Sequence, residues 1–463
     1  MIALLQYGAA QFPERTAIKH GTNSITYGEL YTNTLQWAGK LHSYCGRQTA
    51  LKVAVACANP VSFMQATFAA NYLGYDVVLV NPGTPLVQLL ELLTKHSIEV
   101  LITDSLQLSL DGVKVIAFST IERAQQGNTG FESNKKRAAI TILTGGTTGG
   151  QKAATRNAGI MQYLQPFKAI VRNCNINNHK SIYISLPLFH GFGLASLLMA
   201  VTLGMEISLT SQFDITETLD VIKSGGADVW VGVPTVFQRC IEQIPSNANI
   251  KCIITGGAPL PGTLATKLLE RFGQVVYNLY GSSEAGFCMM ATPAMLALHP
   301  ETIGKPLPGV RATLSPTGTL IIQSKWGMLH SRNIDTGDIC HIDENGFYYL
   351  KGRADDMIVS GGENAYATDV EHALLHLPHV AEAAVVSIAD DDFHARFRAF
   401  VVLDIGQSSN ESMLLDGLRS TLSRHQMPVS ITICDALPLT AIGKIDKKAL
   451  VETSTLQPTA INL

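Results

Sequence analysis

The sequence lacks several features that would point to a function at once. Its charges nearly cancel, with 34 lysines and arginines against 37 aspartates and glutamates, so a nucleic-acid partner is not indicated. Its eight cysteines form no C-x-x-C pair, which disfavours a zinc site or a disulfide framework. Charged residues make up only 15% of the chain against 46% hydrophobic residues, so long disordered segments are not expected.

The chain also has little that is typical of export or of membrane insertion. Its first 20 residues do not combine a basic start with a long apolar run, so we expect no signal peptide. The most apolar stretch, residues 192–205, falls short of the roughly 18 residues that a membrane span needs. We therefore expect a buried helix there, and a soluble protein of the cytoplasm without a membrane span.

Short apolar runs alternate with helix-length segments between about residues 50 and 280. Such nearly continuous β-branched runs are typical of parallel strands that are buried on both faces of a sheet. The runs that we predict to be strands are residues 52–58, 76–82, 99–104, 138–146, 181–188, 228–234 and 251–257. Several of them end in loops with Gly or Pro, and ligands in such folds bind at the carboxyl ends of the strands.

The pattern changes between about residues 305 and 352. Short apolar segments are separated there by tight turns, with the sequences PTGT at residues 316–319 and ENG at residues 344–346. Turns of this composition are typical of antiparallel strands. This part of the chain therefore predicts a small antiparallel β subdomain.

The residues after Gly352 have a third pattern. Thr368 to Glu371 match a capping box and predict the start of a helix that ends near Pro378, with two strands and a further helix after it. A chain of 463 residues is long enough for at least two domains. We predict an α/β protein whose large N-terminal domain, residues 1–352, has doubly wound, mostly parallel sheets plus the antiparallel subdomain. A small α+β C-terminal domain, residues 353–463, follows.

A segment rich in Gly and Thr, residues 144–152, directly follows the predicted strand AAITIL. Its glycines let backbone N–H groups point into one concavity, its hydroxyls add donors, and Lys152 adds a positive charge. It is not a Walker loop, because Gln151 and Ala153 interrupt the required Gly-Lys-Ser/Thr ending. The segment is suited to binding a polyphosphate, and the alternative is an ordinary surface turn.

A second segment with polar residues, residues 280–284, follows the strand-like sequence VVYNL and ends in Glu284. A carboxylate that faces a phosphate loop is a natural Mg²⁺ ligand, because Mg²⁺ prefers hard oxygen ligands and phosphates. Taken alone, a solvated glutamate in a turn is the simpler interpretation.

These segments and three later ones occur in the order typical of one family. The chain resembles the adenylate-forming superfamily of acyl-CoA synthetases, nonribosomal-peptide adenylation domains and luciferases, and it is closest in motif style to acyl- or aryl-CoA ligases. The family patterns T-S-G-T-T-G-x-P-K-G, Y-G-x-T-E, T-G-D, G-R-x-D-D and L-P-x-T-x-x-G-K match residues 144–153, 280–284, 336–338, 352–356 and 437–444. The resemblance covers essentially the whole chain.

The resemblance implies an AMP-forming acid–thiol ligase with ATP, Mg²⁺ and CoA as cofactors. A carboxylic acid would be activated to an acyl-adenylate with release of pyrophosphate, and the acyl group would then pass to the thiol of CoA. Two alternatives stay open: transfer to the phosphopantetheine thiol of a carrier protein, and a non-catalytic nucleotide-binding homologue. Departures from the patterns, such as Gly145 for Ser and Gln151 for Pro, remove no catalytic group.

The resemblance also implies roles for individual residues. The nucleotide would be held by Thr144, Gly145, Gly146, Thr147, Thr148, Gly149, Lys152, Gly256, Gly257, Ala258, Pro259, Asn278, Tyr280, Gly281, Ser282, Ser283, Asp338, Arg353 and Lys444. The candidate catalytic residues are Lys444, Glu284, Thr144 and His190, of which Glu284 and Thr144 would bind Mg²⁺. Asp338 would hold the ribose hydroxyls, and Lys444 would bridge the carboxylate and the α-phosphate. Asp355 would be the hinge of a mobile C-terminal domain, and Gly361 and Gly362 would line the passage for the thiol.

The substrate acid is less clearly indicated. His190 lies in the segment PLFHGFG, residues 187–193, where the acid pocket of this family begins. Relatives that activate amino acids carry an Asp there to pair the ammonium group, so a free α-amino acid is disfavoured. A core histidine bonded to the backbone is the alternative role for His190. Fatty, aromatic and succinylbenzoate-like acids stay open, as do the acceptor thiol, the oligomeric state and the pathway.

Overall fold

The computed structural model of the chain shows two compact units. The described residues are 1–20, 23–46, 51–104, 110–124, 138–145, 151–156, 160–210, 213–245, 247–282, 284–327, 333–360, 363–390, 394–441 and 443–456. The first unit comprises Met1–Gly232, Gln243–Ile254 and Lys325–His330, and the second comprises Val233–Glu242, Thr255–Ser324 and Ser331–Leu463.

One sheet of the first unit has the strand order β6-β5-β3-β4-β7-β8. Its strands are β3 (Lys52–Ala56), β4 (Asp76–Leu79), β5 (Val100–Thr103), β6 (Lys114–Ala117), β7 (Ile140–Gly145) and β8 (Gln151–Arg156). Neighbouring strands are parallel, except that β7 and β8 pair antiparallel. The intervening helices are α3 (Pro60–Tyr72), α4 (Leu86–Lys95) and α5 (Phe118–Arg123).

The first unit contributes a second run of strands in the order β11-β9-β10-β1-β2, again parallel apart from the pair of β1 and β2. These strands are β1 (Thr16–His20), β2 (Asn23–Thr26), β9 (Ser181–Ile184), β10 (Glu206–Leu209) and β11 (Val229–Gly232). The helices are α1 (Ile2–Gln11), α2 (Tyr27–Tyr44), α6 (Ile160–Asn173), α7 (Gly191–Leu203) and α8 (Ile215–Lys223), with a 3₁₀ turn at Ile176–Asn178. Strand β12 (Cys252–Gly256) begins in this unit and ends in the second.

The predicted parallel sheets are confirmed, because each of the predicted apolar runs contains one of these strands. The apolar stretch at 192–205 is the buried helix α7, as expected. The helix ends at Gly204, whose φ of +66° and whose contact with Phe12 leave no room for a side chain. In the part of the chain that the structure describes, no helix has the length and hydropathy to cross a membrane.

In the second unit, seven strands pair antiparallel in the order β16-β17-β18-β19-β15-β14-β13. They are β13 (Val276–Ser282), β14 (Gly286–Ala291), β15 (Thr302–Pro306), β16 (Arg311–Leu314), β17 (Thr319–Gln323), β18 (Ile334–Ile342) and β19 (Tyr348–Arg353). The predicted turns at 316–319 and 344–346 connect β16 to β17 and β18 to β19, so the antiparallel subdomain is confirmed. The helices here are α9 (Pro234–Cys240), α10 (Gly262–Phe272) and α11 (Pro293–Leu298), and a 3₁₀ turn at Ile241–Gln243 follows α9.

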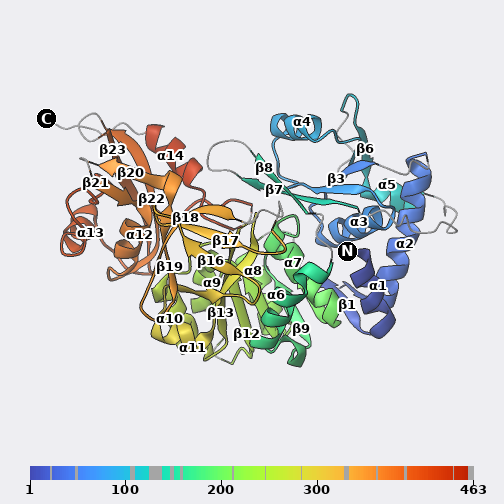
Figure 1. Ribbon diagram of the computed structural model, residues 1–463, viewed down its shortest axis with the longest axis horizontal. Helices are drawn as coiled ribbons and strands as arrows, with labels where there is room; N and C mark the ends of the chain where they lie inside the picture. The colour runs from blue at the N-terminus through green and yellow to red at the C-terminus, as the bar shows by residue number, and fades with distance from the viewer. Residues whose placement is uncertain are drawn as a thin grey trace. The chain divides into compact units, whose positions relative to one another are not determined.

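The last part of the second unit is a small α+β sheet structure, as predicted (Figure 1). Its elements are η3 (Ala354–Asp356), β20 (Met357–Ser360), β21 (Glu363–Tyr366), α12 (Ala367–Leu375), β22 (Val380–Asp390), β23 (His394–Leu403), α13 (Glu411–Leu418), β24 (Ser430–Ile433) and α14 (Lys447–Leu456). Side chains on one face of β22, such as Val385, pack with α12 and α13. Those on the other face, such as Ala384 and Val386, pack with Leu437 and with Leu450 of α14.

The predicted capping box at Thr368 is wrong, although the helix itself is present. Helix α12 begins two residues earlier than that box requires, with Tyr366 in place of Thr368 as the N-cap residue and without a capping side chain. The carboxylate of Glu371 bonds instead to the backbone N–H of Val385 at 2.8 Å and to Lys447 at 2.7 Å. The Glu371 carboxylate, which the local pattern assigned to the helix end, is therefore bound by Val385 and Lys447 instead.

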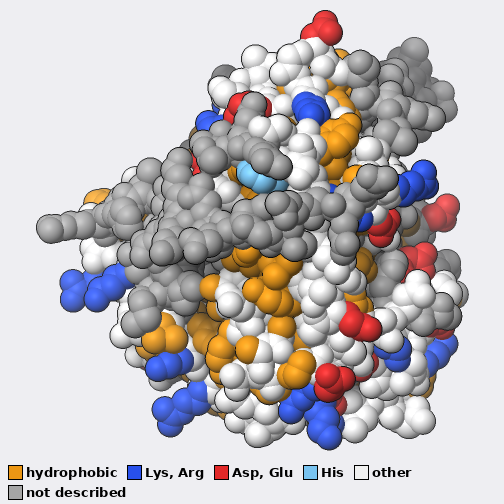
Figure 2. Space-filling model, turned by 90° about the vertical axis from the view of Figure 1, so that its right-hand side faces the viewer, with side chains coloured by type: hydrophobic (Ala, Val, Ile, Leu, Met, Phe, Trp, Pro, Cys, Tyr) orange, Lys and Arg blue, Asp and Glu red, His pale blue; other side chains and the backbone are white. Residues whose placement is uncertain are grey.

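The distribution of charge on the surface agrees with the nearly equal numbers of positive and negative residues. On the face shown in Figure 2, side chains of both charge signs are scattered among the described residues, and neither sign gathers into a patch. All eight cysteines are free thiols, and seven of them are buried. Burial raises the pKa of Cys240 and of Cys340 to about 12.

Close backbone packing in the antiparallel subdomain generates a stability prediction. Gly304 has a φ of +81°, and a Cβ there would lie 2.0 Å from the carbonyl oxygen of Met290 on the paired strand β14. Gly304→Ala should lower the free energy of unfolding by at least about 3 kcal/mol, because strain and overlap add. Gly346→Ala is the control, since Gly346 has a φ of +75° but nothing within 4 Å of a Cβ.

Urea denaturation of both variants checks the prediction. The control should lose only about 1 kcal/mol, the cost of the backbone conformation alone. Equal losses in the two variants would show that the approach of Met290 does not matter.

Candidate active site

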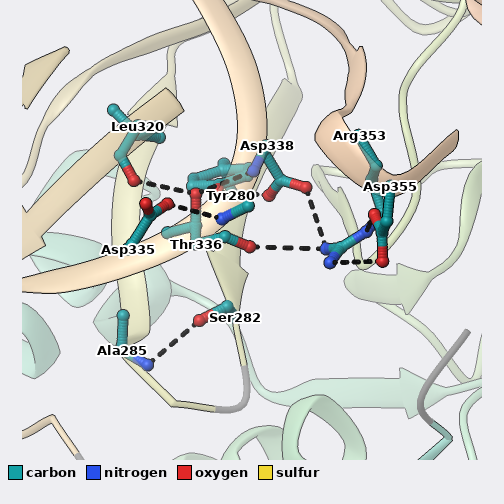
Figure 3. A network of polar contacts seen from close by, with 10 residues as sticks. Tyr280, Ser282, Ala285, Leu320, Asp335, Thr336, Asp338, Arg353 and Asp355 are labelled. Atoms are coloured by element: carbon teal, nitrogen blue, oxygen red, sulfur yellow. Dashed lines mark hydrogen bonds and ion pairs between the residues drawn. The ribbon is translucent and has the colours of Figure 1, made fainter. Parts of the chain in front are cut away.

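The carboxylate of Asp338 lies at the centre of a polar network in the second unit (Figure 3). The hydroxyl of Tyr280, on β13, donates to Asp338 Oδ2 at 2.6 Å. Arg353, at the end of β19, donates through Nη1 to Asp338 Oδ1 at 3.1 Å. Asp338 and Arg353 are direct partners in the pairing of β18 with β19, so the sheet itself brings them together.

Local hydrogen bonds shape the turn that presents Asp338. Asp335 Oδ1 accepts from the N–H of Gly337 at 2.9 Å, and Thr336 Oγ1 accepts from the N–H of Asp338 at 3.2 Å. Gly337 has a φ of +72°, and a Cβ there would lie 3.1 Å from Nη2 of Arg353. The Thr-Gly-Asp sequence therefore suits both the backbone conformation and the close approach of the guanidinium.

The surroundings of Asp338 change its pKa and that of its partner Tyr280. Burial raises the pKa of Asp338 above its usual value, although the Tyr280 hydroxyl and the Arg353 charge act in the opposite direction. Burial and the nearby carboxylate raise the pKa of Tyr280, so its hydroxyl stays protonated and remains a donor. A carboxylate has about four lone-pair sites, so these two protein donors leave room for two ligand hydroxyls.

Arg353 links this carboxylate to the predicted hinge. Its Nε donates to Asp355 Oδ1 at 2.8 Å and its Nη2 donates to Asp355 Oδ2 at 3.4 Å, while Nη1 contacts Asp338. The guanidinium also donates to the carbonyl of Thr336 at 3.4 Å. One planar side chain thus connects the end of β19, the turn in β18 and η3.

Lys444 belongs to the same electrostatic environment. Burial, the largest influence, lowers the pKa of Lys444, while Asp338 raises it and Arg353 lowers it further. The residue sits in a tight loop in which its N–H donates to Thr440 Oγ1 at 3.2 Å and its carbonyl accepts from the N–H of Thr440 at 2.7 Å. Gly443, with a φ of +76°, makes the turn before it. Tyr280, Asp338 and Arg353 are thus joined by hydrogen bonds, and Lys444 lies close enough to Asp338 and Arg353 for their charges to act on its pKa.

Helix α9 contacts this loop through residues that the sequence analysis missed. Thr235 donates from Oγ1 to the carbonyl of Gly443. Arg239 donates to the carbonyl of Leu437 at 2.9 Å and forms a two-pronged ion pair with Glu382, at 2.8 and 3.0 Å. The available signal was Glu382 itself, a charged residue within the otherwise apolar residues 380–386 that begin β22.

The other predicted nucleotide residues of the second unit lie at strand ends. Gly256, Gly257, Ala258 and Pro259 follow the apolar part of β12, with Gly257 and Pro259 exposed. Asn278 is buried, and its amide donates to the carbonyl of Thr302 at 3.3 Å. In the pairing of β13 with β14, a Cβ on Gly281 would lie 2.3 Å from the carbonyl oxygen of Gly286. Ser282 Oγ accepts from the N–H of Ala285 at 3.0 Å, which closes the turn that carries the half-buried Glu284.

The remaining predicted residues are only partly described. Thr144 and Gly145 end β7 and pair with Lys152 and Gln151 of β8, so two antiparallel strands flank the predicted phosphate loop. His190 is the half-buried N-cap residue of α7, and its N–H donates to the carbonyl of Pro187 at 3.2 Å. The residues that lie outside the described part are Gly146, Thr147, Thr148, Gly149, Ser283, Gly361 and Gly362.

Family models match most of the chain. The model of the AMP-binding enzyme matches residues 5–329, and the model of the AMP-binding enzyme C-terminal domain matches residues 369–444. The chain is 27% identical to a 2-succinylbenzoate–CoA ligase of Bacillus velezensis, over 95% of each chain. It is 28% identical to a ligase of the same name from Lactococcus lactis, over 93% of this chain and 97% of that one.

Solved structures share this fold over nearly the whole length. One is o-succinylbenzoate CoA synthetase of Bacillus subtilis in complex with the acyl-adenylate intermediate OSB-AMP, with a TM-score of 0.84, 25% identity and coverage of 96% of this chain and 97% of that one. The same enzyme with ATP and a magnesium ion gives a TM-score of 0.82, 25% identity and coverage of 96% and 98%.

The raised pKa of Asp338 generates a prediction about ligand binding. Adenosine affinity should weaken as the pH falls through this raised pKa, because a protonated carboxyl is a poorer acceptor for ribose hydroxyls. Adenosine is the probe because it carries no phosphate that titrates in the same range. Asp338→Asn should bind about 10-fold more weakly at neutral pH, the scale of one hydrogen bond to a charged group.

Isothermal titration calorimetry at a series of pH values from neutral downward measures both effects. The affinity of the Asn variant should show no acidic decline. An acidic decline that persists in this variant would assign the titration to another group.

Proposed function

The chain belongs to the AMP-binding enzyme family, and we propose that it activates 2-succinylbenzoate and transfers it to CoA. The chain is an AMP-forming acyl-CoA synthetase that uses ATP, Mg²⁺ and CoA. The observation that carries the choice of acid is the match, over at least 93% of this chain, to ligases named for that acid.

The reaction has two displacements. A carboxylate oxygen of the acid attacks the α-phosphorus of ATP and pyrophosphate leaves, so the poor electrophile becomes an acyl-adenylate. The thiol of CoA then attacks the acyl carbon and AMP leaves. Asp338 accepts hydrogen bonds from the ribose hydroxyls. The Lys444 ammonium offsets the negative charge that builds up where the carboxylate of the acid meets the α-phosphate of ATP.

Glu284 and Thr144 are the residues that would hold Mg²⁺. Glu284 offers a half-buried carboxylate directly after β13, the hard oxygen donor that this ion prefers. Among the described residues, no three His, Cys, Asp or Glu side chains are grouped so as to bind a metal by themselves. Glu284 and Thr144 are few donors for Mg²⁺, and they fit an ion that is held mainly by the phosphates of the substrate. The ion would neutralise the negative charge of those phosphates.

The residue at position 190 favours a dicarboxylic aromatic acid over an amino acid. Only one of the two carboxylates of 2-succinylbenzoate is activated, and the other must be met by donors or by positive charge. His190 and the first N–H groups of α7 can supply both, whereas an Asp at this position would repel a second carboxylate.

The domain arrangement completes the proposal. We place the boundary after residue 352, with Asp355 as the hinge and with Gly361 and Gly362 along the path of the thiol. The contacts of Arg353 with both Asp338 and Asp355 support a hinge that responds to the nucleotide. The eight free thiols support a reducing compartment such as the cytoplasm.

A substrate panel tests the proposed acid. Pyrophosphate release should have a kcat/KM for 2-succinylbenzoate at least ~10²-fold above the values for benzoate, octanoate and phenylalanine, because the second carboxylate needs matched donors. Thioester formation should proceed with CoA and not with a phosphopantetheinylated carrier protein. A preference for octanoate or for the carrier protein would reject the proposal, and no activity with any acid would favour the non-catalytic homologue.

Lys444→Ala tests the two-step mechanism. The variant should adenylate about 10²–10³-fold more slowly, the usual scale for the loss of one preorganised charge in a transition state. Supplied with acyl-adenylate made beforehand, it should still form the CoA thioester at close to the wild-type rate. Normal adenylation by this variant would remove Lys444 from the first step.

A further inference from the structure

We infer that helix α9 is the docking element that positions Lys444 for the adenylation step, through the side chains of Arg239 and Thr235. This inference rests on the proposed two-step function, because it assigns the contacts of α9 to the first step alone. Neither residue touches the reacting groups in this assignment, so both are positioning residues.

The contacts of α9 bracket the segment that carries Lys444. Arg239 binds the carbonyl of Leu437, where the segment begins, and Thr235 binds the carbonyl of Gly443, the residue directly before Lys444. A Cβ on Gly443 would lie 3.3 Å from Cγ2 of Val233, so the loop lies against the start of the helix. A shift of the loop relative to α9 would therefore displace Lys444 relative to Asp338.

The ion pair of Arg239 and Glu382 can hold the C-terminal segment against α9 reversibly. Glu382 is only 8% exposed and lies on the face of β22 that otherwise packs Ala384 and Val386 against Leu437. A buried carboxylate is costly unless it is paired, and here the two-pronged contact of Arg239 pairs it. If the C-terminal segment moved away from α9, water would solvate both ions. The pair therefore favours the docked arrangement without making it permanent.

Half-reaction measurements on three variants test the inference. Arg239→Met keeps the length of the side chain and removes the charge, Arg239→Lys keeps the charge and removes the fork, and Thr235→Val removes one donor. Arg239→Met should adenylate ~10–100-fold more slowly, the scale of a small misplacement of a catalytic group, with smaller losses in the other two variants. All three should convert preformed acyl-adenylate and CoA to thioester within about twofold of the wild-type rate, since Lys444 acts only in the first step.

Two controls separate positioning from general destabilisation. Lys251→Gln breaks the 2.6 Å ion pair with Asp228 inside the first unit, and it should leave both half-reactions unchanged. The exchange variant with Arg239→Glu and Glu382→Arg should recover part of the adenylation that Arg239→Met loses, because the ion pair forms again in the opposite sense.

A chemical readout keeps the inference independent of the substrate. Acetylation of Lys444 by an amine reagent, followed by peptide mass spectrometry, should be several-fold faster in Arg239→Met than in the wild type, because the loop is no longer held. Unchanged acetylation, or equal loss of both half-reactions in folded Arg239→Lys and Thr235→Val, would overturn the inference. A wild-type enzyme that prefers another acid would reject only the proposed substrate, since the same measurements can then be made with that acid.

Discussion

A half-buried carboxylate with a donor on each side is the constraint on which the candidate site depends. The Tyr280 hydroxyl and the Arg353 guanidinium each donate to one oxygen of Asp338, and both oppose the rise in its pKa that burial causes. Those two residues come from β13 and β19, so three strands must keep their register for one acceptor to point correctly. Because Arg353 also donates to Asp355, the same side chain connects Asp338 to the chain segment that follows β19.

Most of the fold was predictable because burial leaves a recognisable hydrophobic pattern in the sequence. Strands such as β3 and β11 are covered on both faces, and they therefore read as continuous apolar runs. The prediction of a capping box at Thr368 was wrong because a contact distant in the sequence, which leaves no local pattern, decides the position of Glu371. Glu371 has a partner in the backbone of Val385, a residue that no local pattern could bring close.

The site was predictable only to the extent that its residues fall in recognisable motifs. Tyr280, Asp338, Arg353 and Lys444 each belong to a family pattern. Hydrogen bonds join the first three, and Lys444 lies close enough to Asp338 and Arg353 for their charges to act on its pKa. The contact of Arg239 with Glu382 joins residues 143 positions apart, and neither residue belongs to such a pattern. A single sequence shows spacing along the chain and not proximity in space, so an ion pair of this kind becomes visible only in the folded structure.

The burial of the thiols has a consequence for an enzyme that makes an acyl-adenylate. This intermediate acylates any thiolate that can reach it, including a thiolate of the protein itself. A thiol with a pKa of about 12, such as that of Cys240 or Cys340, is ionised in roughly one molecule in 10⁵ at neutral pH. Burial therefore protects the chain from self-acylation and leaves the incoming CoA as the favoured nucleophile.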